Sequence, residues 1–193
     1  MVLVAIAPPA FDVESYMVYA TDANFTGRPV YRRPGCYLHP DAAILLSRAI
    51  VLAAELGLRL KLYDAFRPSE AQWLLWEHTP DPDFLADPRR GSPHSRGVAV
   101  DVTLVDGGPI DGALVERAGR ELDMGSPVDG AGPLARHGCT DIPATAQRNR
   151  AILLGLMAAA GWDHYLNEWW HYQMFEPRRY PVLTDAAAGT AMM

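Results

Sequence analysis

Cysteine is scarce in this chain of 193 residues, which contains only Cys36 and Cys139. Two Cys in a chain of this length make no disulfide framework, and their wide separation excludes the paired spacing of a zinc knuckle. We therefore expect both thiols to be reduced. The length fits one domain, residues 1–193, which would remove roughly 70% of its unfolded surface from water.

Basic residues are also few, with 17 Lys and Arg against 23 Asp and Glu and a formal net charge of -6. This balance argues against a nucleic-acid partner, because phosphate binding needs a basic face. No apolar run is long and charge-free enough to suggest a membrane span. The apolar residues 1–9 lack the basic start of a signal peptide, so we predict an edge strand or arm there and a cytoplasmic protein. The sequence leaves the oligomeric state open.

Three helices are predicted, over residues 40–56, 68–78 and 145–160. Pro40 suits the first turn of the first helix, and Gly57 suits the position just past its end. That helix is apolar nearly all round, so we expect it to be mostly buried.

Three strands are predicted, at residues 58–63, 97–105 and 168–175. Leucines alternate with polar residues along the first, and valines occupy one face of the second. Residues 79–93 and 106–143 are rich in Pro or Gly and are predicted to be surface loops. Because helices and strands do not alternate regularly, we favour an α+β fold with a mainly antiparallel central sheet flanked by helices.

The first segment with chemical potential reads Ser-Pro-His-Ser-Arg-Gly-Val-Ala-Val-Asp, from Ser92 to Asp101. Asp101 lies on the strand face away from the valines, where an unpartnered carboxylate is costly to bury. His94 would be about 23 Å away in an extended chain, so the two meet only if the chain bends, which Gly97 permits. Taken alone, the pair is better explained by a turn-capping Asp and a surface His.

The second segment is Glu-Trp-Trp-His, from Glu168 to His171. Catalytic zinc commonly uses three protein ligands and leaves one position for water, and His94, Asp101 and His171 are suitable ligands. Glu168 would then be free to act as a base. Residues three apart in a strand face opposite sides, so Glu168 must lie on a bend before the strand. The alternatives are core packing for the tryptophans and an ordinary surface charge for Glu168.

A third segment places Arg67 between a predicted strand and a predicted helix, where its side chain can be aimed into a cleft. Arg is well suited to holding a carboxylate or a developing oxyanion. The alternative is a salt bridge to Asp64 or Glu70.

Together these segments resemble the VanX-type D-alanyl-D-alanine dipeptidases, part of a group of zinc peptidases that includes D,D-carboxypeptidases and the zinc-binding hedgehog domain. The signatures Ser-x-His-x-x-Gly-x-Ala-x-Asp, Glu-x-Trp-His and Asp-x-x-Arg-Pro are complete at residues 92–101, 168–171 and 64–68. Weaker matches extend the resemblance to about residues 15–181.

The resemblance implies a zinc peptidase fold of the carboxypeptidase and hedgehog type, and hydrolysis of D-alanyl-D-alanine, a unit of bacterial cell-wall precursors. It implies one Zn2+ per chain, bound by His94, Asp101 and His171. Glu168 would act as general base and then acid, and Arg67 would steady the carbonyl oxygen as it becomes anionic. The residues expected to hold the dipeptide substrate are Ser92, Tyr19 and Asp129, with Asp129 facing its ammonium group.

The chain departs from the family pattern at residues 130–133, Gly-Ala-Gly-Pro, where relatives have a run rich in Met, Asp and Glu. This leaves the substrate length less defined than the metal site. Two alternatives remain open: a D,D-carboxypeptidase or endopeptidase acting on cell-wall peptides, and a non-catalytic zinc-binding module. The module would need neither Glu168 nor Arg67.

Overall fold

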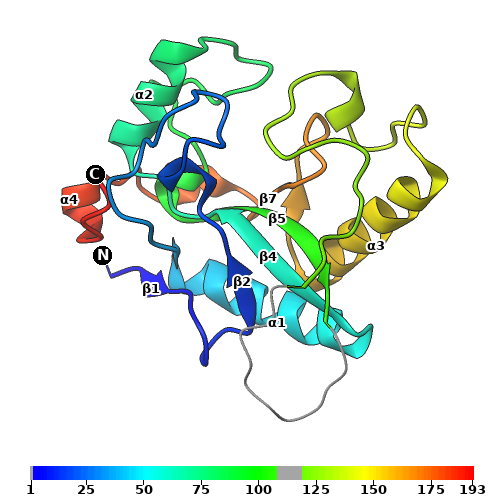
Figure 1. Cartoon of the computed structure of the whole chain (residues 1–193). Coiled ribbons are helices and arrows are strands. Elements are labelled where there is room, and N and C mark those ends of the chain that lie inside the picture. Colours follow the sequence, from blue (N-terminus) through cyan, green and yellow to red (C-terminus); the bar gives the residue numbers. More distant parts are fainter. Residues whose placement is uncertain (1, 108–118) are drawn as a thin grey trace.

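A five-stranded sheet crosses the molecule in the computed structural model, which describes residues 2–107 and 119–193 (Figure 1). The strand order is β2-β4-β5-β7-β6. β2 pairs parallel with β4, and the other three pairings are antiparallel. The predicted α+β class is therefore confirmed. The strands are β2 (Val13–Ser15), β4 (Leu58–Asp64), β5 (Ala99–Asp106), β7 (His171–Gln173) and β6 (Asp163–His164).

The two long central strands, β4 and β5, are both confirmed with boundaries shifted by one or two residues. β5 is buried from Ala99 to Val105 on both of its faces, because it has a neighbouring strand on each side and packs between two layers. Its register with β4 shifts between Leu62 and Asp64, so that Asp64 pairs with Asp101. This shift brings two carboxylates together at one end of the sheet.

Helices α1 (Pro40–Glu55) and α3 (Ala144–Ala160) pack against each other and cover one face of the sheet (Figure 1). The expectation that α1 is mostly buried is wrong, since Ile44 and Val51 are 55% and 61% exposed. Only one stripe of the helix meets the core, because α1 lies on the outside of a layered structure with its far face toward solvent. The buried residues of α1 are Ala42, Ala43, Leu46, Ala49 and Ala53.

A second apolar cluster joins the N- and C-terminal segments beside the end of β4. It includes Tyr19, Tyr31 and Phe66, together with residues of α2 (Ser69–His78) and of the C-terminal segment near α4 (Asp185–Ala188). Figure 1 shows the two chain ends near each other on this side. The cluster therefore supports the loop that carries Arg67.

The remaining elements are short. β1 (Val4–Ala5) pairs antiparallel with β3 (Tyr37–Leu38), as expected for an N-terminal strand. The predicted strand 168–175 is reduced to β7, because a turn at residues 169–170 precedes it, and β6 was not predicted. Part of the predicted loop 106–143 lies outside the described residues.

Among the described helices, none combines the length and apolar character needed to cross a membrane. The single-turn helices are η1 (Val18–Ala20), η2 (His94–Arg96), η3 (Pro133–Ala135) and η4 (Pro177–Arg179).

Candidate active site

The chain folds back between His94 and Asp101, as the sequence predicts. His94 begins the single turn η2, and Gly97 follows in the left-handed conformation with φ 68°. The amide of Gly97 donates to the carbonyl of His94 at 2.9 Å, and that of Val98 donates to the carbonyl of Pro93 at 3.1 Å. A residue with a side chain adopts this φ only at a cost, which explains why glycine permits the bend.

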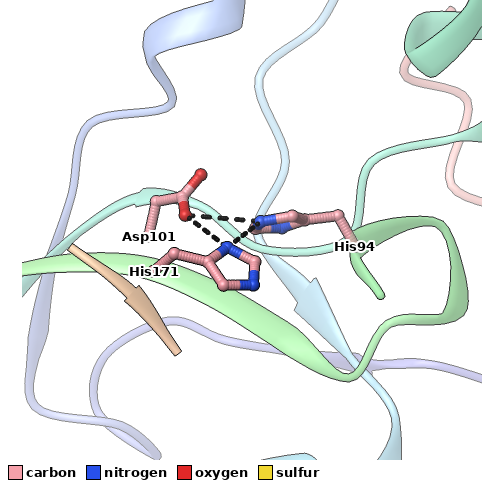
Figure 2. A group of neighbouring side chains, drawn as sticks. All are labelled: His94, Asp101 and His171. Atoms are coloured by element: carbon pink, nitrogen blue, oxygen red, sulfur yellow. Dashed lines mark hydrogen bonds and ion pairs between the residues drawn. The ribbon is translucent and has the colours of Figure 1, made fainter. Parts of the chain in front are cut away.

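Three donor atoms from distant parts of the chain converge beside this bend (Figure 2). Asp101 and His171 pair directly across β5 and β7. Asp101 Oδ1 lies 3.1 Å from His171 Nδ1 and 3.3 Å from His94 Nε2, and the two nitrogens are 3.1 Å apart. All three side chains are buried. The sequence-predicted ligands are thus brought together, with one ligand atom from each lying within 4.8 Å of the others.

The surrounding hydrogen bonds show why a cation fits between these atoms. His94 Nδ1 lies 2.7 Å from the carbonyl oxygen of Ala65, and His171 Nε2 lies 3.2 Å from Gln173 Oε1. Both oxygens are acceptors, so each of these ring nitrogens carries its proton and donates. When both imidazoles are in the neutral form that binds metals, the other nitrogens, His94 Nε2 and His171 Nδ1, present lone pairs to each other and to a carboxylate. Three acceptors in contact repel one another unless a cation lies between them, which is how metal ligands are oriented.

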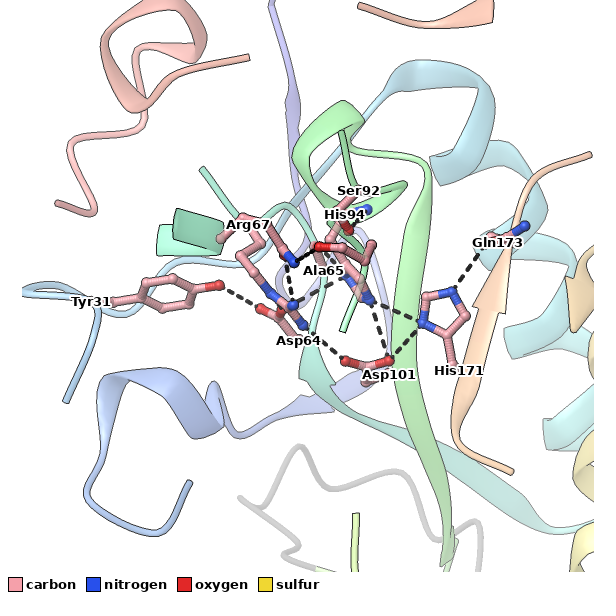
Figure 3. Close-up of polar contacts among 11 residues, drawn as sticks. Tyr31, Asp64, Ala65, Arg67, Ser92, His94, Asp101, His171 and Gln173 are labelled. Carbon is pink, nitrogen blue, oxygen red and sulfur yellow. Dashed lines mark hydrogen bonds and ion pairs between the residues drawn. The ribbon is translucent and has the colours of Figure 1, made fainter. Parts of the chain in front are cut away.

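A layer of polar contacts lies behind the three donors (Figure 3). Arg67 Nε donates to Asp64 at 2.8 Å, and another Arg67 nitrogen lies 3.5 Å from Asp101 Oδ2. Arg67 also donates to Gln72 at 3.0 Å. The hydroxyl of Tyr31 donates to the second oxygen of Asp64 at 2.8 Å. The salt bridge from Arg67 to Asp64 therefore exists, and it fixes the guanidinium in place beside the cavity.

A cavity of about 200 Å³ opens in front of these side chains. All eight sequence-predicted site residues line it: Tyr19, Arg67, Ser92, His94, Asp101, Asp129, Glu168 and His171. Ser92 Oγ accepts a bond from the amide of His94 at 3.2 Å, and the ring of Tyr19 lies 4.7 Å from the Arg67 guanidinium carbon. Gln173 was not predicted to belong to the site, and Asp64 was predicted only as an alternative salt-bridge partner of Arg67. Asp64 was signalled by its place in the Asp-x-x-Arg-Pro segment.

Glu168 lies on the predicted bend before β7, where its amide donates to the carbonyl of Tyr165 at 3.1 Å. Burial raises the pKa of Glu168 to about 8; His171 opposes the shift, and Asp101 and Asp129 add to it. Trp169 and Trp170, which follow, are both buried, so the core-packing alternative is correct for them. Trp170 also lines the cavity.

Asp129, like Glu168, is a cavity carboxylate with a raised pKa. Burial, reinforced by the charge of Asp101, raises the pKa of Asp129 to about 7. Its Oδ2 atom is buried and has no hydrogen-bond partner among the described residues. The residue also has a φ of 59°, a conformation that only a few per cent of non-glycine residues adopt. A buried acceptor without a partner is suited to a cationic group from a ligand.

Comparisons with known proteins agree with this geometry. A family model described as D-ala-D-ala dipeptidase matches residues 2–183. The chain is similar to the D-alanyl-D-alanine dipeptidase of Escherichia coli, with 38% identity over 90% of this chain and 85% of the relative. It is also similar to the D-alanyl-D-alanine dipeptidase of Streptomyces coelicolor, with 34% identity over 82% of this chain and 84% of the relative. The similarity to that of Enterococcus faecalis is 30% over the same shares.

The matched region contains the three converging donors, the polar layer behind them and every predicted residue of the cavity. The chain belongs to the D-ala-D-ala dipeptidase family, a family of metal-dependent peptidases.

Proposed function

We propose that this chain is a zinc-dependent dipeptidase that hydrolyses D-alanyl-D-alanine to two molecules of D-alanine. One observation carries the proposal: His94, Asp101 and His171 present converging donor atoms on the wall of a cavity that also contains Glu168. The names of the related proteins support the same substrate.

Zinc is the metal that this donor set favours. Two imidazole nitrogens and one carboxylate oxygen are common ligands of catalytic zinc, and three protein ligands leave one position open. Bound zinc supplies Lewis acidity, which polarises a carbonyl group and makes water a nucleophile near neutral pH. The hydrogen bonds from His94 to Ala65 and from His171 to Gln173 hold the imidazoles in the orientation that this role requires.

Glu168 is the general base. In this role its carboxylate accepts the proton of the attacking water and passes it to the nitrogen of the leaving residue. A pKa raised toward neutrality by burial suits a group that must both take and give a proton. Its position on the turn before β7, and not on the strand, lets it face the same cavity as His171.

Arg67 stabilises negative charge on the carbonyl oxygen of the scissile bond. Its contacts with Asp64 and Gln72 fix the guanidinium before substrate arrives, so that little reorganisation is needed during the reaction. These contacts use only part of its five N–H groups, and the side chain lines the cavity.

The substrate is held at its amino end by Asp129, whose partnerless Oδ2 faces the ammonium group, while Tyr19 and Ser92 complete that wall. The cavity of about 200 Å³ lies below the roughly 300–1,000 Å³ of ordinary ligand pockets, as expected for a small dipeptide. A longer or N-blocked peptide offers no ammonium group at this position, so it would lose the ion pair with Asp129.

Turnover of D-alanyl-D-alanine, N-acetyl-D-alanyl-D-alanine and a D-alanine tripeptide tests the proposal. We expect zinc-dependent hydrolysis of the free dipeptide and much slower hydrolysis of the other two. Equal or faster cleavage of the N-acetylated peptide would instead identify a D,D-carboxypeptidase. Absence of any hydrolysis by the zinc-loaded protein would favour a binding module.

A further inference from the structure

Arg150 is a buried cation outside the cavity whose contacts reach both sides of the site. It lies on α3 and is only 5% exposed. Burial lowers its pKa below the usual value for arginine, so the surrounding contacts must offset an unfavourable desolvation. A buried guanidinium at this cost calls for a structural or functional reason.

The hydrogen bonds of Arg150 end on uncharged oxygens of one loop and its flanks. Nε donates to the carbonyl of Met124 at 2.6 Å, and a terminal nitrogen donates to the carbonyl of Leu134 at 2.8 Å. A further bond reaches the carbonyl of Arg136 at 3.1 Å. Asp129 lies midway between Met124 and Leu134, so one guanidinium holds both ends of the loop that carries it.

The same guanidinium is linked to the turn that carries Glu168. It lies 5.4 Å from the centre of the Trp169 ring, and Trp169 directly follows Glu168. Arg150 and the indole nitrogen of Trp169 both donate to Ser126 Oγ, at 3.1 and 3.0 Å. The amide of Trp169 also donates to the carbonyl of Ala135, at 2.9 Å. The segments that carry Asp129 and Glu168 are thus tied to one side chain.

We propose that Arg150 is a positioning residue that fixes the Asp129 loop relative to the Glu168 turn and thereby sets the distance across which a dipeptide fits. Its planar fork satisfies several carbonyls at once, which a lysine ammonium cannot reproduce with the same geometry. The catalytic consequence rests on the proposed function, whereas the clamping of the two segments does not.

Hydrogen exchange tests the clamp independently of activity. In Arg150→Lys, we expect faster amide exchange in residues 124–134 and 165–169 and unchanged exchange in β4 and β5. Arg148→Lys, the same substitution on an exposed position of α3, serves as the matched control. Wild-type exchange at both segments in Arg150→Lys would overturn the proposal.

A double-mutant cycle with Asp129→Asn tests the catalytic consequence. In the wild-type background, Arg150→Lys should lower kcat/KM for D-alanyl-D-alanine about 10- to 100-fold, mainly through KM, because a small misplacement of a binding group is costly. In the Asp129→Asn background the same substitution should have a much smaller effect. An equal loss in both backgrounds would show that Arg150 does not act through Asp129 and would overturn the proposal.

Two further measurements keep these outcomes distinct. Ser126→Ala removes the acceptor that Arg150 and Trp169 share. It should raise the amide exchange rate and KM, as Arg150→Lys does, but by a smaller factor. This variant provides the test if Arg150→Lys does not fold. If the wild-type protein leaves D-alanyl-D-alanine intact, the proposed function fails, and the exchange experiment still decides the clamp.

Discussion

Replacing Gln173 by leucine should weaken zinc binding although Gln173 is not itself a proposed ligand. Gln173 Oε1 accepts the proton of His171 Nε2 at 3.2 Å, because residues two apart on β7 face the same side. Without this acceptor, the imidazole loses the contact that fixes its tautomer and its ring orientation. The lone pair on Nδ1, which must face the metal, is then less available.

The size of the effect follows from the geometry of this contact. Loss of such a supporting hydrogen bond typically costs about 10- to 100-fold in metal affinity. The contact is long and only partly buried, so water can replace some of it, and we expect a loss near the lower end, about tenfold. Competition with a chromogenic zinc chelator measures the change directly.

Gln147→Leu is the matched control, because Gln147 also uses its side-chain amide for hydrogen bonds, to the carbonyls of Thr140 and Ile142 just before α3. We expect this control to bind zinc as tightly as the wild-type protein. Equal zinc affinities for Gln173→Leu and Gln147→Leu would refute the reasoning that Gln173 orients His171.

Three further outcomes are expected. Glu168→Gln should lower kcat by about 10²- to 10⁴-fold and leave zinc content unchanged, and a wild-type kcat would remove Glu168 from its role as base. The raised pKa of Asp129, about 7, means that its carboxylate becomes protonated below that pH, so KM should rise between about pH 7.5 and pH 6 in the wild-type protein but not in Asp129→Asn; parallel profiles would contradict this. Burial lowers the pKa of His137 to about 4, so this side chain takes up a proton at a higher pH in the unfolded chain than in the folded protein. The free energy of unfolding should therefore fall as the pH drops from about 6.5 toward 4. In urea unfolding experiments, the free energy of unfolding of His137→Gln should fall less steeply with pH than that of the wild-type protein. An equal pH dependence of the two proteins would argue against this role of His137.

The convergence of His94, Asp101 and His171 could be predicted because each lies in a segment whose local pattern also fixes its geometry. Gly97 signals the bend that returns His94 to Asp101, and the period of β5 shows which face Asp101 occupies. The same period shows that Glu168 cannot share a strand face with His171, so a bend had to precede β7. The structure confirms both bends.

The supporting contacts could not be predicted, because they join side chains through tertiary packing. Tyr31 donates to Asp64 across 33 positions of sequence, and Arg150 reaches Met124 across 26. Neither separation leaves a periodic signal. The exposure of Ile44 on α1 was missed for a related reason: apolar composition indicates that a helix has a buried face but does not show how many layers cover it.

The most direct test of the central claim is the anomalous scattering map of crystals of the zinc-loaded protein, collected at the zinc absorption edge. We expect one strong peak at about 2.0–2.2 Å from His94 Nε2, an Asp101 carboxylate oxygen and His171 Nδ1. A peak coordinated by other side chains, or no peak among these three, would contradict it.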